Sequence, residues 1–134
     1  MPRSMVIEIA QTGPSTSRAS IRSHPVVVDR PIDKGGNDRG PMGGELLLAS
    51  LGGCFVSTLL AAVRAREAAV SDVRVSVTGS IGGAPERFEA IAMRVSATHQ
   101  DGELMRKLID IAERGCLVTN TLKQAMPVTV EVAD

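Results

Sequence analysis

The uncharged segment formed by residues 46–63 constrains the fold of this chain more than any other feature. It follows a glycine-rich loop, ends in charge at Arg64, and has the composition of one long helix. About 20 apolar residues would cross a bilayer, but Ser50, Gly52 and Ser57 dilute this segment, so we interpret it as a helix of a soluble protein. A helix that is apolar on every side must be covered on every side. The segment therefore predicts a long central buried helix and no membrane span.

The same segment predicts a second subunit. Gly52 and Gly53 lie in its middle, and a glycine in a helix interior costs about 1 kcal/mol relative to alanine. We attribute both glycines to the close approach of packed neighbours. A sheet from the same chain can cover one face of the helix, but a chain of 134 residues has little left to cover the other. We therefore predict an intertwined homodimer with this helix near its core.

The segments on either side of the helix predict short strands and two further helices. Apolar and polar residues alternate in the expected strands, as they do in half-buried strands, and turn residues separate them. This order is typical of an α+β domain with a mostly antiparallel sheet, and the length suits a single domain over residues 1–134. The expected strands are 5–11, 18–23, 25–29, 70–80, 88–98 and 128–132, and the further helices are 101–114 and 116–125.

Composition excludes several function classes. The chain has 15 Lys and Arg against 15 Asp and Glu, so no net charge attracts it to nucleic acid or to acidic lipid. It has no Trp or Tyr, which leaves no aromatic platform for stacking bases. His24 and His99 have no Cys or His partner at metal-ligand spacing, so we expect no metal site. The N-terminal residues do not resemble a signal peptide, which predicts a cytoplasmic protein.

The two cysteines are the candidates for chemistry. Cys116 begins an expected helix, where the helix dipole favours a thiolate, whereas Cys54 lies mid-helix and needs an external cation. Arg39 in the preceding loop is our candidate for that cation, with the Glu45 carboxylate orienting its guanidinium. Each residue also has a structural interpretation. Free cysteines often act as small buried hydrophobes, a carboxylate at a helix start compensates the dipole, and an arginine in a loop is often merely solvated.

Two motifs of this chain resemble those of the OsmC/Ohr family. The first is ELLLASLGGC, which ends at Cys54 and follows Gly35-Gly36 and Gly40-Pro41, and the second is CLVTNTL, which begins at Cys116. The order of the expected elements is also similar, so the resemblance covers nearly the whole chain. The first motif is closer to the general OsmC-like branch of the family. The resemblance implies an OsmC-like fold.

The resemblance also implies a cytosolic homodimer that acts as a thiol-dependent peroxidase on organic hydroperoxides in oxidative and osmotic stress defence. Cys54 would be the peroxidatic thiolate and Cys116 the resolving thiol, and a dithiol such as a dihydrolipoyl protein would reduce their disulfide. No metal or organic cofactor is implied. The family's active-site arginine could correspond to one of several residues of this chain. These are Arg18, Arg22, Arg30 and Arg39.

Two other functions fit the same fold. In the first, the protein is a non-catalytic module that binds a small hydrophobic ligand at the dimer interface, and its cysteines take no part. In the second, it is a purely structural stress protein. A thiol count before and after peroxide treatment separates the peroxidase from both alternatives.

Overall fold

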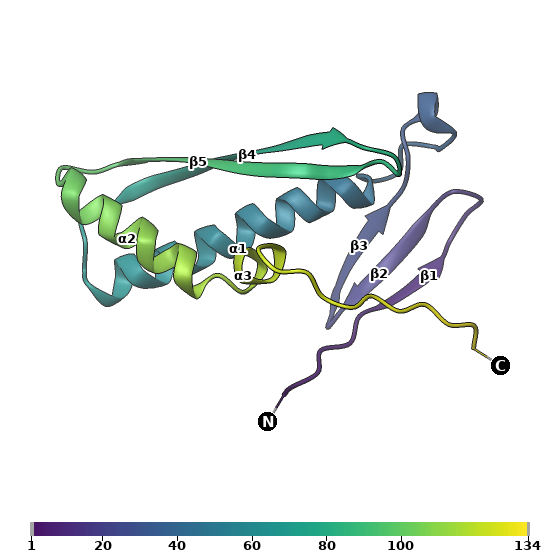
Figure 1. Ribbon diagram of the computed structural model, residues 1–134, viewed down its shortest axis with the longest axis horizontal. Coiled ribbons are helices and arrows are strands. Elements are labelled where there is room, and N and C mark those ends of the chain that lie inside the picture. Colours follow the sequence, from purple (N-terminus) through teal and green to yellow (C-terminus); the bar gives the residue numbers. More distant parts are fainter. Residues whose placement is uncertain (1, 134) are drawn as a thin grey trace. The chain divides into compact units, whose positions relative to one another are not determined.

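The structure, a computed structural model, describes residues 2–133 and has the element order β-β-β-α-β-β-α-α, with a short 3-10 helix before the first α-helix (Figure 1). The predicted α+β class is confirmed, and all strand pairs of the described residues are antiparallel. The chain divides after Leu47 into two compact units, which are described separately below. The prediction of a single domain stays a prediction. The elements are β1 (Glu8–Gln11), β2 (Ser17–Ile21), β3 (His24–Val28), η1 (Ile32–Lys34), α1 (Gly43–Ala65), β4 (Ser71–Gly82), β5 (Arg87–Thr98), α2 (Gly102–Gly115) and α3 (Leu117–Leu122).

The N-terminal unit contains a small antiparallel meander. Its strands lie in the order β1-β2-β3, with Ile9 opposite Ala19 and Ala19 opposite Val26. The predicted strands at 18–23 and 25–29 are confirmed with slightly different ends, whereas β1 begins at Glu8 and not at residue 5. The apolar residues before Glu8 are exposed, Met5 to 86%. Within residues 2–133, the first part of the predicted strand is thus exposed and does not pack into a core.

A buried carboxylate fastens the loop that leads to α1. Asp29 follows β3 and is 2% exposed. Its side chain accepts hydrogen bonds from Ser15 Oγ at 2.8 Å, Thr16 Oγ1 at 2.9 Å, the Arg30 amide at 2.7 Å and the Arg39 amide at 3.1 Å. Burial raises the pKa of Asp29, but these four donors outweigh burial and hold the pKa well below its usual value. The carboxylate therefore stays charged and joins the loop to the sheet.

Helix α1 is longer than the uncharged segment and is buried along one face. It begins three residues earlier, at Gly43, and ends at Ala65. Its length and composition would suffice to cross a membrane, a criterion that core helices of soluble proteins also meet. One third of its most apolar window, 33%, is buried within the chain. The predicted long helix is confirmed, and much of its uncharged surface is left uncovered by the chain itself. The buried residues are Leu51, Gly52, Phe55, Leu59, Ala62 and Val63.

The β4–β5 hairpin lies along α1 in the C-terminal unit (Figure 1). Val73, Val75 and Val77 of β4 are half-buried and the residues between them are exposed, so the predicted alternation is confirmed. The helix approaches this face closely at Gly52, where a Cβ atom would lie 2.9 Å from Val77 Cγ2. The close approach of Val77 thus explains why residue 52 is a glycine. No atom within 4 Å would meet a Cβ at Gly53, so the same explanation is not available for Gly53 within the chain.

The core of the C-terminal unit lies between α1 and α2. Asp101 caps α2 by accepting a hydrogen bond from the Leu104 amide at 3.0 Å. The apolar face of α2 then packs on α1, as its amphipathic pattern predicts. The core cluster includes Cys116, which is fully buried. The other buried members are Phe55, Leu59, Ala62 and Val63 of α1 and Met105, Leu108 and Ala112 of α2.

The prediction of a final strand at 128–132 is wrong for the single chain. Residues 125–133 have no regular secondary structure. A strand needs a neighbour for its backbone hydrogen bonds, and within residues 2–133 no strand pairs with this segment. The last helix is also shorter than predicted, Leu117–Leu122. The alternating valines are exposed: Val128 to 81%, Val130 to 94% and Val132 to 92%.

Candidate active site

The middle of α1 holds Cys54 at the edge of the core. Cys54 is half-buried and packs against the core cluster. Because α1 carries no charge along this stretch, the surroundings that it gives Cys54 are apolar. The backbone carbonyl of Cys54 also accepts a hydrogen bond from Thr58 Oγ1 at 2.9 Å, one turn further along the helix. The helix thus fixes the position of Cys54 and leaves part of its surface open to solvent.

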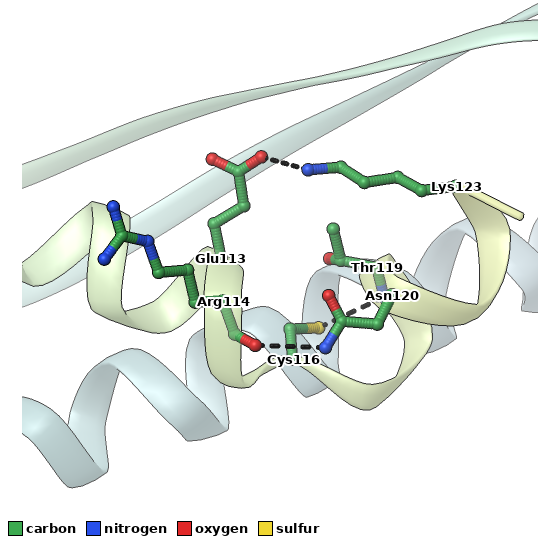
Figure 2. Close-up of polar contacts among 6 residues, drawn as sticks. All are labelled: Glu113, Arg114, Cys116, Thr119, Asn120 and Lys123. Atoms are coloured by element: carbon green, nitrogen blue, oxygen red, sulfur yellow. Dashed lines mark hydrogen bonds and ion pairs between the residues drawn. The ribbon is translucent and has the colours of Figure 1, made fainter.

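The junction of α2 and α3 holds Cys116 inside the core. Cys116 follows Gly115, the last residue of α2, and has an extended backbone with φ −82° and ψ 111°. It therefore ends one helix and caps the next. Its Sγ accepts a hydrogen bond from the Thr119 amide at 3.4 Å, as the side chain of an N-cap residue does (Figure 2). The sulfur is 0% exposed.

The structure brings the two cysteines together although they are far apart in the sequence. Both are free thiols, and Cys54 packs against the cluster that contains Cys116. Cys54 is also one of the groups that lower the pKa of the Cys116 thiol. Two cysteines of one packed cluster can form a disulfide when their Cα atoms come within about 7 Å of each other. This proximity is the condition that a two-cysteine redox pair must meet.

The surroundings of Cys116 favour its thiolate. Burial raises the pKa of the Cys116 thiol, but donors around the sulfur outweigh burial and lower the pKa below its ordinary value. These donors are the side chain and amide of Thr119, the Cys54 thiol and the Val118 amide. The Thr119 hydroxyl oxygen is buried and has no partner in a full hydrogen bond among residues 2–133. It is therefore free to turn its hydrogen toward the sulfur.

Two side-chain contacts fasten the helix junction around Cys116 (Figure 2). Lys123 at the end of α3 forms an ion pair with Glu113 of α2, and this contact lowers the pKa of the Glu113 carboxyl. Asn120 Nδ2 donates to the Arg114 carbonyl at 3.0 Å. Sequence reasoning did not identify these residues or Thr119. The one available signal was the position of Thr119 three residues after Cys116, where an N-cap finds its donor.

Arg39 and Glu45 lie in the N-terminal unit, so their approach to the cysteines stays a prediction. Glu45 Oε1 accepts a hydrogen bond from the Met42 amide at 2.8 Å, which gives Glu45 a role at the start of α1. The Arg39 amide donates to Asp29, and the Arg39 side chain is exposed. Among residues 2–47, no ion pair joins Glu45 to an arginine. The other three candidate arginines are Arg18, Arg22 and Arg30.

A shallow hollow lies on the surface beside α3, near Cys116. It has a volume of about 530 Å³ and includes the exposed side chains of Leu117 and Met126. Neither cysteine lines it. Within residues 2–133, no group of three or more His, Cys, Asp and Glu residues lies together in a way that could hold a metal ion. The residues around this hollow are Gly115, Leu117, Asn120, Thr121, Gln124 and Met126.

Comparison with known proteins supports the interpretation of the motifs. The family model described as OsmC-like protein matches residues 35–131. No curated protein matches the chain. Several solved structures share its fold. Their sequence identities to this chain are too low to indicate a shared function. A hypothetical protein from Aquifex aeolicus VF5 superposes with a TM-score of 0.77 at 16% identity, over 91% of this chain and 89% of that one.

Two further solved structures with the same fold belong to an OsmC-like protein and an organic hydroperoxide resistance protein. The OsmC-like protein from Mycoplasma pneumoniae has a TM-score of 0.73 at 19% identity and covers 92% of this chain and 89% of its own. An organic hydroperoxide resistance protein from Elizabethkingia anophelis has a TM-score of 0.71 at 20% identity and covers 92% of this chain and 91% of its own. The fold is therefore shared along most of both chains in each case.

Proposed function

The chain belongs to the OsmC-like protein family, and on this premise we propose that it is a thiol-dependent peroxidase that reduces organic hydroperoxides through Cys54 and Cys116. Family membership and the hydroperoxide-resistance name of a structural neighbour support a role in peroxide stress. The observation that supports the finer proposal is that Cys54 of α1 packs against the core cluster that contains Cys116, and that both cysteines are free.

The different burial of the two cysteine residues supports different roles for them. Cys54 is half-buried and can meet a substrate from solvent, whereas Cys116 is fully buried. Cys54 therefore attacks the peroxide, the O–O bond breaks, the alcohol leaves with the thiol proton, and a sulfenic acid remains on Cys54. The Cys116 thiolate then attacks the Cys54 sulfur, and hydroxide leaves and takes up a proton as water. An external dithiol, such as a dihydrolipoyl group, reduces the resulting disulfide.

An arginine that stabilises the Cys54 thiolate belongs to the same proposal. Arg39 is our candidate, with Glu45 as its partner, and Arg18, Arg22 and Arg30 are the alternatives. Single alanine variants of the four arginines should identify the residue by a loss of peroxide reactivity in one of them. For Glu45 the informative change is Glu45→Gln, because glutamine keeps the acceptor for the Met42 amide and removes only the charge.

We also propose that the protein works as a homodimer. The chain leaves one face of its uncharged helix uncovered, and a second copy is the partner whose matching face could cover it. The exposed valines at 128, 130 and 132 alternate as a strand would and would find their hydrogen-bonding partner in the same way. The exposed residues along α1 include Gly53, Ser57, Leu60 and Ala61.

Sedimentation analysis tests the dimer. The unaltered chain should sediment as a dimer, and Gly53→Leu should weaken the dimer because the new side chain occupies the face expected to contact the second copy. Arg106→Leu is the matched control, since Arg106 lies on the exposed side of α2. A monomer at all concentrations would contradict the proposal, and so would equal weakening by both substitutions.

The last two parts of the proposal concern the cellular location of the protein and its domain organisation. Free thiols persist in reducing compartments, and both cysteines of this chain are free. We therefore propose a cytoplasmic location. We also propose that residues 1–134 function as one domain without a bound cofactor.

A thiol count tests the peroxidase directly. One equivalent of cumene hydroperoxide per chain should remove both free thiols of the unaltered protein and should leave the single thiol of Cys54→Ser unchanged. Cys116→Ser should instead form a sulfenic acid on Cys54, which dimedone traps and mass spectrometry locates. If the thiol count of the unaltered protein stays constant, the peroxidase proposal is wrong. Binding of a small hydrophobic ligand with equal affinity to Cys54→Ala would then favour the non-catalytic alternative.

A further inference from the structure

The hydroxyl group of Thr119 is an exception to the rule that buried polar groups are hydrogen-bonded. Thr119 is 7% exposed, and its Oγ1 atom has no partner in a full hydrogen bond within the described part of the chain. A buried hydroxyl without a partner destabilises a fold, so such a group calls for an explanation other than stability. A valine has nearly the same shape as threonine and would avoid the cost of a buried hydroxyl without a partner.

The position of Thr119 supplies that explanation. Its amide is 3.4 Å from the Cys116 Sγ atom (Figure 2), and its side chain is one of the groups that lower the pKa of the Cys116 thiol. A hydroxyl hydrogen rotates to suit its acceptor, and a neutral thiol is a weak acceptor whereas a thiolate is a strong one. The Thr119 amide already donates to the sulfur, and the unpaired hydroxyl can turn and add a second hydrogen bond when the sulfur becomes negatively charged.

We infer that Thr119 is a positioning residue that stabilises Cys116 as the leaving thiolate when the Cys54–Cys116 disulfide is reduced, so that the reductant attacks Cys54. This inference rests on the proposed redox function of the two cysteines. It adds the direction of the reductive step, which follows from Cys54 being a half-buried residue and Cys116 being fully buried with the Thr119 amide at its sulfur.

The reductive step proceeds by two exchanges. A thiolate of the external dithiol attacks Cys54 Sγ, a bond forms between these two sulfurs, and the bond from Cys54 to Cys116 breaks. Cys116 leaves with the electron pair and is held as a thiolate by Thr119. The second thiol of the dithiol then attacks the reductant sulfur of the mixed disulfide, the bond to Cys54 breaks, and the departing Cys54 sulfur takes up the proton that the second thiol loses. The reductant is released as a cyclic disulfide. A leaving thiol with a lower pKa leaves faster.

Among the described residues, no charged side chain is one of the groups that lower the pKa of the Cys116 thiol. The nearby charged side chains on α2 and α3 are Glu113, Arg114 and Lys123, of which Glu113 and Lys123 pair with each other (Figure 2). Cys54 is the titratable group that faces Cys116 from α1. The residues that β4 and β5 pack against the cluster are apolar: Val73, Val75, Met93, Val95 and Ala97.

A titration of Cys116 tests the two donors without any peroxidase activity. In the Cys54→Ser background, the ultraviolet absorbance of the Cys116 thiolate is followed against pH. The absence of Trp and Tyr gives this chain a low background. Thr119→Val should raise the midpoint by about one pH unit, the value of one hydrogen bond to a charged group. Thr119→Ser should leave the midpoint near that of the parent, because serine keeps both donors.

The rate of disulfide reduction tests the direction of attack. The disulfide of the full chain is formed with diamide, so the assay does not depend on peroxide chemistry, and dithiothreitol then reduces it. Thr119→Val should slow this reduction roughly threefold, if the leaving thiol has a Brønsted coefficient near the value of about 0.5 for an attacking thiol. Thr119→Ser should reduce at the parent rate. Trapping the mixed disulfide in a monothiol reductant should place it on Cys54.

The outcomes separate this inference from the proposed function. Equal midpoints and equal reduction rates in Thr119→Val and the parent would overturn the role of Thr119, as would a mixed disulfide on Cys116. If diamide forms the disulfide and Thr119→Val behaves as expected, the inference stands even when peroxide fails to oxidise the cysteines. Thr119→Val should also unfold at an equal or higher urea concentration, whereas a structural hydroxyl would show a loss of stability.

Discussion

Replacing Gly52 by alanine tests the close contact between α1 and β4 on which the position of Cys54 depends. Alanine in a helix interior is favoured over glycine by about 1 kcal/mol. At Gly52, however, the new Cβ would lie 2.9 Å from Val77 Cγ2, a distance that forces the helix or the strand to move. Overpacking of this kind costs about 1–3 kcal/mol. We therefore expect Gly52→Ala to lower the free energy of unfolding by up to about 2 kcal/mol.

A double-mutant cycle isolates the contact. Val77→Ala removes the one atom that the new Cβ would meet within 4 Å. In that background Gly52→Ala should stabilise the protein by about 1 kcal/mol, because only the helix preference remains. The coupling free energy between the two positions should thus be about 1–3 kcal/mol. Gly53→Ala is the matched control, since no atom of its own chain lies within 4 Å of the added carbon.

Urea denaturation followed by far-ultraviolet circular dichroism measures these differences, because the chain has no Trp for fluorescence. If Gly52→Ala stabilises the protein equally in both backgrounds, the helix does not approach β4 as described, and the reasoning fails. A loss of stability in Gly53→Ala that grows with protein concentration would report a second copy at this face.

Three further predictions concern the rest of the fold. Leu108→Ala, which removes a fully buried side chain of α2, should lower the free energy of unfolding by about 2–5 kcal/mol in urea denaturation. Asp101→Ala should cost about 0.5–2 kcal/mol in the same assay through the lost cap of α2, and Asp101→Asn should recover most of it. Asp29→Asn should lower the melting temperature at pH 7 because the Ser15 and Thr16 hydroxyls and two amides lose their charged acceptor. The pKa of Asp29 is lower in the folded than in the unfolded chain, so its contribution is complete above the unfolded pKa and falls as the pH drops below about 4. The difference between Asp29→Asn and the parent should therefore shrink in melts below that pH, and a constant difference would contradict the assignment.

The elements of this fold that depend on their own residues were predictable from the sequence. The uncharged run gave α1, alternating valines gave β4, and the spacing of Leu104, Leu108 and Ala112 gave α2. The segment at 128–132 has the same alternation as β4 and yet forms no strand in the single chain. Alternation shows that a segment can form a strand, but the partner for its hydrogen bonds lies elsewhere. Local patterns could not show whether that partner belongs to the same chain.

The candidate site was predictable in part for a similar reason. Both cysteines could be selected from their motifs and from their positions in the expected helices. Their contact depends on how α2 packs against α1, which no local pattern contains. Thr119 was missed because a threonine near a helix start is common, and its significance comes from being buried without a partner next to a particular sulfur. The opposite holds for Glu45. It was predicted as a site residue, but its side chain accepts a hydrogen bond from the Met42 amide at the start of α1.

Burial also explains how one chain can give two identical side chains different chemistry. In the proposed cycle, a peroxide or a dithiol reaches the residue that borders solvent, so the half-buried position of Cys54 would make it the point of attack in both directions. Cys116 is fully buried and would react only with Cys54. Because Cys116 also caps α3 and lies between the helices that Glu113 and Lys123 join, its sulfur can move toward Cys54 only as far as this junction allows. The helix junction should therefore set the rate of disulfide formation, and a charge reversal at Lys123 that loosens it should change that rate without changing the first attack on peroxide.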